Sequence, residues 1–182
     1  MWKKIARYID VPVTLFLTGH VHPEEPIELT DNIQIGNHSF EHKEWYDIQD
    51  AEKAGDMMKN HEFLEEKYGI TPTVYRSPHL RMSKWVDNFM KKKGYKREME
   101  CAECIWCPPM EHAHLKKYFS SHHHFGPHPC HRKFEEAFQL LCEKGKDFTF
   151  FLDPNHFETE ERVESLKNLI SIGKDFGEFK KL

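Results

Sequence analysis

Short apolar runs of strand length alternate along this chain with longer segments whose apolar residues recur at helical spacing. The runs of strand length occupy residues 12–18, 32–36, 73–76 and 148–152, with weaker ones at 95–100 and 117–120. The helical patterns occupy residues 50–68, 83–93, 132–144 and 160–172, and each ends just before a glycine. This alternation predicts an α/β fold in which crossover helices join a mainly parallel sheet, closed as a barrel or open. Ligands in such folds bind where strands end and loops begin.

The composition is that of one globular domain covering residues 1–182. Of the 182 residues, 38% are hydrophobic and 13% aromatic, which suffices for a sizeable core. The formal net charge is -4, and lysine and arginine are scattered among acidic residues, so we expect no nucleic-acid partner. No run approaches the roughly 20 apolar residues of a membrane span, and the first ten residues lack a signal-peptide apolar region. We therefore expect no membrane contact and a cytoplasmic location.

Two histidines, His38 and His42, directly follow the second apolar run. If a helix begins at about Asn37, their spacing places both imidazoles on one helical face, within reach of a single metal ion. Zinc that activates water normally has three protein ligands and an open position. The pair therefore predicts a divalent metal site whose third ligand comes from elsewhere in the chain.

Three segments in this region carry a family resemblance. They are VTLFLTG at 13–19, GNHSFEH at 36–42 and YRSP at 75–78. Their order and spacing resemble the polysaccharide deacetylase family, which removes N- or O-acetyl groups from sugars. In that family a TFF-x-x-G strand precedes an H-[ST]-x-x-H metal motif and an R-x-P motif. The resemblance covers most of the chain, is strongest over residues 11–80, and implies a distorted (β/α) barrel.

The resemblance also implies roles for individual residues. His38 and His42 would be ligands of zinc or another divalent ion, and Arg76 would orient the catalytic carboxylate. Pro78 would shape the wall of the substrate groove. By its position directly after Pro78, and not by the resemblance, His79 is expected either to line the same mouth or to lie exposed in the first turn of a helix. The expected partner is a carbohydrate substrate.

The first motif of the family has no counterpart here. It is an Asp-Asp pair at the end of the first strand that supplies the catalytic base and the third metal ligand. Upstream of the first apolar run only residues 1–9 remain, and they resemble the helix that follows that strand. We therefore expect a barrel lacking its first strand, either truncated or degenerate, and self-association through the surface this strand would cover. Asp10, Asp31 and Asp153 are the nearest substitutes at strand ends, and none sits in a matching motif.

The last motif is altered as well. The family has a strand leading into a histidine that protonates the leaving amine, and here residues 148–152 lead into Asp153-Pro154-Asn155-His156. An ungapped match places Asp153 at the position of the histidine, whereas a shift of three residues brings His156 there. We prefer His156 because it is the only imidazole near this strand end.

A Cys/His-rich segment at about 101–131 suggests a second metal site. Cys101, Cys104 and Cys107 form a C-x-x-C-x-x-C run, and thiolates at this spacing can chelate zinc or an iron-sulfur cluster. Fourth ligands are available from His112, His114 or Cys130. A loop with partly buried cysteines explains the run equally well. The odd cysteine count argues against a disulfide framework.

Three functions remain open at this point. The first is a metal-dependent hydrolase that removes acetyl groups from an N-acetylated sugar or polysaccharide. The second is a catalytically inactive relative that binds carbohydrate or metal, which the missing aspartates favour. The third is a Cys/His zinc or iron-sulfur module on an unrelated α/β scaffold.

Overall fold

The computed structural model describes residues 6–21, 25–43, 48–78, 83–98, 119–121, 143, 148–150 and 159–181. The chain divides into two compact units, each described here by itself. One unit comprises residues 13–100 and 181–182, and the other comprises residues 1–12 and 101–180. None of the helices in the described part is long and apolar enough to cross a membrane.

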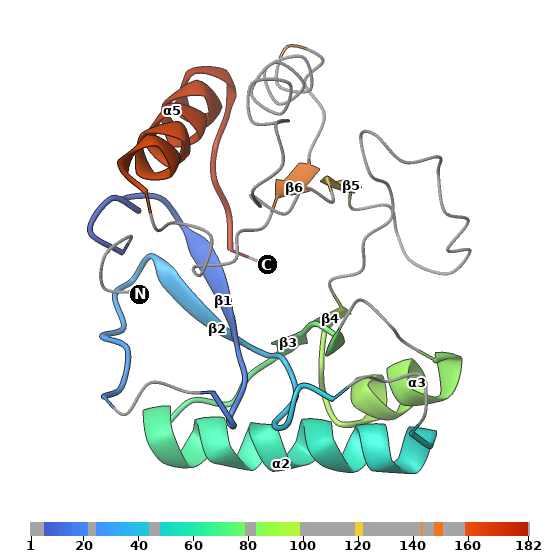
Figure 1. Cartoon of the computed structure of the whole chain (residues 1–182). Coiled ribbons are helices and arrows are strands. Elements are labelled where there is room, and N and C mark those ends of the chain that lie inside the picture. Colours follow the sequence, from blue (N-terminus) through green and yellow to red (C-terminus); the bar gives the residue numbers. More distant parts are fainter. Residues whose placement is uncertain are drawn as a thin grey trace. The chain divides into compact units, whose positions relative to one another are not determined.

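The unit of residues 13–100 contains a four-stranded parallel sheet with the order β1-β2-β3-β4 (Figure 1). Its strands are β1 (Val13–Leu17), β2 (Ile33–Asn37), β3 (Val74–Tyr75) and β4 (Arg97–Glu98). β1 and β2 pair along their whole length, whereas β2 and β3 meet only at Asn37 and Tyr75. The predicted parallel α/β arrangement is confirmed for this unit, and all four strands lie within or beside the predicted runs.

Two helices of this unit pack against the sheet (Figure 1). They are α2 (Asp50–Tyr68) and α3 (Lys84–Lys92). α2 ends at Gly69, whose φ of 65° is the left-handed conformation that closes many helices. α3 begins after Ser83, whose side chain accepts a hydrogen bond from the Val86 amide. Both helices match their predicted ranges to within one residue at each end.

The core of this unit lies between the sheet and the two helices. Its buried members are Met57, Tyr75, Val86, Met90 and Tyr95. A β-carbon on Gly36, the fourth of the five residues of β2, would lie 2.6 Å from the ring of Phe16 on β1. Only a residue without a side chain allows that ring to cross the strand.

The other unit contains a two-stranded parallel sheet and one described helix. The strands are β5 (Phe119–Ser121) and β6 (Phe148–Phe150), and the helix is α5 (Glu160–Phe176). α5 buries Leu166, Leu169 and Ile170. The predicted end of this helix at residue 172 is wrong, because α5 continues through Gly173. Nearly all of the predicted helix at 132–144 lies outside the described residues.

Candidate metal centre

His38 and His42 lie together at the carboxyl end of β2. Their Nε2 atoms are 3.2 Å apart and their ring centroids 4.8 Å apart. Two nitrogen ligands of a tetrahedral zinc ion, each about 2.0–2.1 Å from the metal, lie about 3.3–3.4 Å from each other. The two donor atoms therefore have the separation that one ion requires, and their chemistry fits zinc or a similar divalent cation.

A loop, not a helix, brings the two rings together. The expected helix starting at about Asn37 is wrong, because Asn37 ends β2 and residues 38–43 are not helical. Ser39 and His42 instead adopt left-handed backbone conformations, with φ of 65° and 50°. The His42 amide also donates to the Ser39 hydroxyl, over 3.2 Å. Left-handed conformations at residues other than glycine cost roughly 1–3 kcal/mol each and cluster at functional sites.

The orientation of the His38 ring is set by the next strand. His38 Nδ1 lies 2.8 Å from the backbone carbonyl oxygen of Arg76, which follows β3. A carbonyl oxygen only accepts hydrogen bonds, so Nδ1 carries the hydrogen and the Nε2 lone pair faces His42. Metal-ligating histidines commonly donate their other ring hydrogen to such a carbonyl.

The loop is held on one side by a contact between Gly19 and Phe40. A β-carbon on Gly19 would lie 2.2 Å from the Phe40 ring, so that ring occupies the space of a side chain. The amide of His20 donates to the Phe40 carbonyl over 2.8 Å, and Lys59 Nζ lies 3.7 Å from the centroid of the same ring. Gly19, which ends the segment VTLFLTG, therefore allows the loop of residues 38–43 to pack against the end of β1.

Helix α2 holds the loop on the other side. The Glu41 amide donates to the Asp56 carboxylate, at 3.1 Å and 3.3 Å from its two oxygens. Lys59 Nζ donates to Glu41 Oε1 over 2.9 Å. This hydrogen bond is the main cause that lowers the pKa of the Glu41 carboxyl. Asp56 is buried, so it anchors the loop and does not serve as an exposed ligand.

Asn37 was missed by the sequence reasoning, although it immediately precedes His38. Its side chain is fully buried, and its Oδ1 accepts from the amide of Ser39 over 3.0 Å. An asparagine at the end of an apolar strand is a weak signal, because such residues also occur in ordinary turns.

The remaining predicted site residues divide into three groups. Pro78 is buried two residues after Arg76. Asp10 and Asp31 are both exposed. Asp31 precedes β2 and so lies at the opposite end of this strand from the histidine pair. Asp10 belongs to the other unit, where its carboxylate lies 2.6 Å from Lys174 Nζ. The other predicted residues lie outside the described residues: His79, Asp153, His156, Cys101, Cys104, Cys107, His112, His114 and Cys130.

No third ligand adjoins the pair within the part of the chain that the structure describes. Among these residues, no group of three His, Cys, Asp or Glu side chains could hold a metal ion. The sequence contains no two consecutive aspartates. Any third ligand of an ion at this pair would therefore come from a residue outside the described part or from outside this chain.

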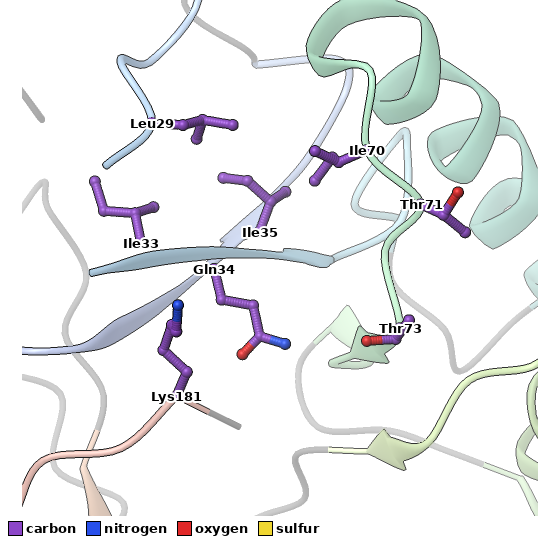
Figure 2. A pocket seen from close by; sticks show the side chains of 8 residues that line it. All are labelled: Leu29, Ile33, Gln34, Ile35, Ile70, Thr71, Thr73 and Lys181. Carbon is purple, nitrogen blue, oxygen red and sulfur yellow. The ribbon is translucent and has the colours of Figure 1, made fainter. Parts of the chain in front are cut away.

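A pocket of about 390 Å³ lies at the other end of the sheet (Figure 2). Leu29, Ile33 and Ile35 line it on one side of β2, with Gln34 and Lys181 on the other. Ile70, Thr71 and Thr73, which precede β3, complete the lining. Strand β2 runs from this pocket toward the histidine pair, so the pocket is separate from the candidate metal centre.

Comparison with known proteins supports one family. The sequence model described as polysaccharide deacetylase matches residues 4–97. No curated protein matches the chain.

Three solved structures show the same fold. A chitin deacetylase from the fungal pathogen Colletotrichum lindemuthianum is 17% identical, with a TM-score of 0.62, over 98% of this chain and 76% of that protein.

The other two structures are a family 4 carbohydrate esterase from Streptomyces lividans and a pseudoenzyme of the same family from Bacillus anthracis. The esterase, solved with acetate, is 12% identical over 82% of this chain, with a TM-score of 0.50. The pseudoenzyme is 16% identical over 98% of this chain, with a TM-score of 0.58. The chain spans 65% of the length of the esterase and 56% of the pseudoenzyme, less than two thirds of either.

Proposed function

This chain belongs to the polysaccharide deacetylase family, and we propose that it acts as a metal-dependent hydrolase removing acetyl groups from an N-acetylated sugar or polysaccharide. The observation that carries this proposal is the 3.2 Å separation between the Nε2 atoms of His38 and His42. The hydrogen bond from His38 Nδ1 to the Arg76 carbonyl supports it, because metal-ligating histidines commonly donate their other ring hydrogen to such a carbonyl.

The proposed chemistry needs a divalent ion at this pair. When bound, such an ion lowers the pKa of water to about 7 and stabilises the oxyanion formed at the acetyl carbonyl. His38 and His42 would bind it through Nε2. The Arg76 side chain would orient the carboxylate that acts as base, and His156, or else Asp153, would protonate the leaving amine. Pro78 and His79 would border the sugar.

The proposed fold is a distorted (β/α) barrel without a counterpart of the first family strand. The likeness to the chitin deacetylase and the parallel order β1 to β4 support the barrel. The absence of an Asp-Asp pair from the 182 residues supports the missing strand. Exposed surface beside β1 would then favour self-association.

A catalytically inactive relative that binds carbohydrate or metal is the second candidate. The observation that favours it is the same absence of an Asp-Asp pair, since the base and the third ligand would both be missing. A protein of similar fold is described as a pseudoenzyme. Inactivity is therefore compatible with this fold.

Acetate release from N-acetylglucosamine oligomers, measured with and without a chelator, distinguishes the two candidates. We expect release by the wild-type chain loaded with zinc, and loss of release with chelator or in a His38→Gln variant. A His20→Gln variant is the matched control, because His20 has an exposed side chain in the same unit. Oligomer binding without acetate release would instead establish the inactive relative.

A further inference from the structure

The side chain of Asn37 is the centre of a buried hydrogen-bond network behind the candidate metal centre. Nδ2 donates to the Met57 carbonyl over 2.8 Å and to the Tyr95 hydroxyl over 2.7 Å. Oδ1 accepts from the Ser39 amide over 3.0 Å and from Asn60 Nδ2 over 2.8 Å. A carboxamide can make four such bonds, and Asn37 makes all four. Its position is therefore fixed from four directions.

Tyr95 links this amide to helix α2. Its hydroxyl also lies 2.8 Å from His61 Nδ1, and His61 Nε2 lies 3.4 Å from Glu65 Oε1. Burial raises the pKa of the Tyr95 hydroxyl, which therefore keeps its proton. Because Asn37 donates to the oxygen of this hydroxyl, the Tyr95 proton is directed to His61 Nδ1, and His61 Nε2–H then faces Glu65.

The network ends at the turn that joins the two candidate ligands. Ser39, whose amide donates to Asn37, is one of the two residues with left-handed backbone conformations in this loop. The other is His42, whose amide donates to the Ser39 hydroxyl. A change in the orientation of the Asn37 side-chain amide would thus shift Ser39, and through Ser39 the position of His42.

We infer that Tyr95, oriented by His61, is a positioning residue that holds the His38–His42 pair at metal-binding separation through Asn37. The inference rests on the proposed metal-binding function. It adds two residues to that function: Tyr95, which is 58 residues from its partner Asn37, and His61, which is 34 residues from its partner Tyr95. Interactions behind metal ligands typically change metal affinity about 10–100-fold when removed.

Tyr75 provides a matched control for this inference. It is 1% exposed, belongs to the same core cluster as Tyr95, and packs edge-to-face on its ring at a centroid distance of 5.4 Å. Its hydroxyl, however, donates to Asp87 Oδ1 over 2.8 Å and does not take part in the network of Asn37. Removing either hydroxyl leaves the aromatic packing in place.

The first test compares Tyr95→Phe and Tyr75→Phe by titration with Co²⁺, followed by visible absorption. We expect the dissociation constant to rise about 10–100-fold for Tyr95→Phe and to stay within about threefold of wild type for Tyr75→Phe. Equal constants for the two variants would overturn the inference. If wild type itself binds no Co²⁺, the proposed metal-binding function fails, and a second measurement still tests the positioning role.

That second measurement is hydrogen exchange of the Ser39 amide without metal. We expect about fivefold faster exchange in Tyr95→Phe, as for a weakened hydrogen bond of about 1 kcal/mol, and no such change in Tyr75→Phe. Unchanged Ser39 exchange in Tyr95→Phe would contradict the inference whether or not metal binds.

A conservative substitution at His61 separates positioning from packing. The Oδ1 of His61→Asn can accept the Tyr95 hydrogen bond, whereas His61→Ala leaves it without this acceptor. We expect His61→Asn to retain Co²⁺ affinity and slow Ser39 exchange, and His61→Ala to lose both. Equal behaviour of the two variants would show that His61 does not orient Tyr95.

Discussion

His38 donates its Nδ1 hydrogen to the backbone carbonyl of Arg76, 2.8 Å away. The donor follows β2 and the acceptor follows β3, so one hydrogen bond joins the ends of two neighbouring strands. Because the acceptor is a backbone atom, substitution of the Arg76 side chain leaves it in place. The roles of the Arg76 backbone and side chain can therefore be tested separately.

An Arg76→Ala variant should keep its metal and lose activity. We expect its zinc dissociation constant to stay within about threefold of wild type and acetate release to fall about 10–100-fold, as for other partners behind a metal site. Calorimetric titration with zinc and an acetate assay measure the two quantities. Loss of zinc affinity in this variant would show that the side chain, too, supports His38.

Zinc should stabilise the folded chain through His42. At a zinc concentration 100 times the dissociation constant, the free energy of unfolding should rise by about 2.7 kcal/mol. The gain should vanish in His42→Asn, because asparagine tolerates the left-handed backbone at this position but lacks the imidazole. Thermal unfolding with and without zinc gives the comparison. An equal gain in the variant would place the bound ion elsewhere.

Gly19→Ala should destabilise the protein. The added carbon would lie 2.2 Å from the Phe40 ring, and such overpacking costs about 1–3 kcal/mol. Gly55→Ala is the control, because nothing lies within 4 Å of its β-carbon on α2 and alanine favours a helix by about 0.5–1 kcal/mol. Urea unfolding measures both. If Gly19→Ala were as stable as wild type, the Phe40 ring would move aside without a cost in free energy.

Asp50 should make a small contribution to stability that is lost in acid. A hydrogen bond from Ser83, and then one from Lys53, lowers the pKa of this carboxyl in the folded chain. Its contribution is therefore complete above the unfolded pKa of about 4 and disappears as the pH falls through the lower folded pKa. Because 36% of the side chain is exposed and solvent screens its interactions, Asp50→Asn should remove at most about 1 kcal/mol at pH 7. Urea unfolding of wild type and Asp50→Asn at pH 7 and pH 3 checks this prediction. An equal loss of unfolding free energy at both pH values would show that the ionised carboxylate is not the source of the stability.

Metal content should depend on the histidine pair and not on the cysteine run. Elemental measurement on a Cys104→Ala/Cys107→Ala double variant should give the zinc content of wild type, whereas a His38→Gln/His42→Asn double variant should contain none. The reverse result would establish the Cys/His module as the metal site.

The strands and helices could largely be predicted because their signals are local. The apolar run of β1 and the periodicity of α2 determine these elements, and Ala54, Met57 and Leu64 are buried as that periodicity requires. The end of α5 was misplaced because a buried glycine continues the helix instead of closing it.

The two candidate ligands could be identified from their spacing, but not the way they meet. A separation of four residues fits a helix, and left-handed conformations at Ser39 and His42 produce the same proximity in a loop. The hydrogen-bond network around Asn37 could not be predicted from the sequence either, because Asn37 and Tyr95 are 58 residues apart and no periodic pattern links them.

The pocket at the end of the sheet opposite the His38–His42 pair is a site where the protein can be stabilised. Bulkier aliphatic groups introduced around Ile33 and Thr73 could stiffen the scaffold there without disturbing the imidazoles at the far end of the same strand. The stability of this sheet can thus be changed at one end while the His38–His42 pair at the other end stays as it is.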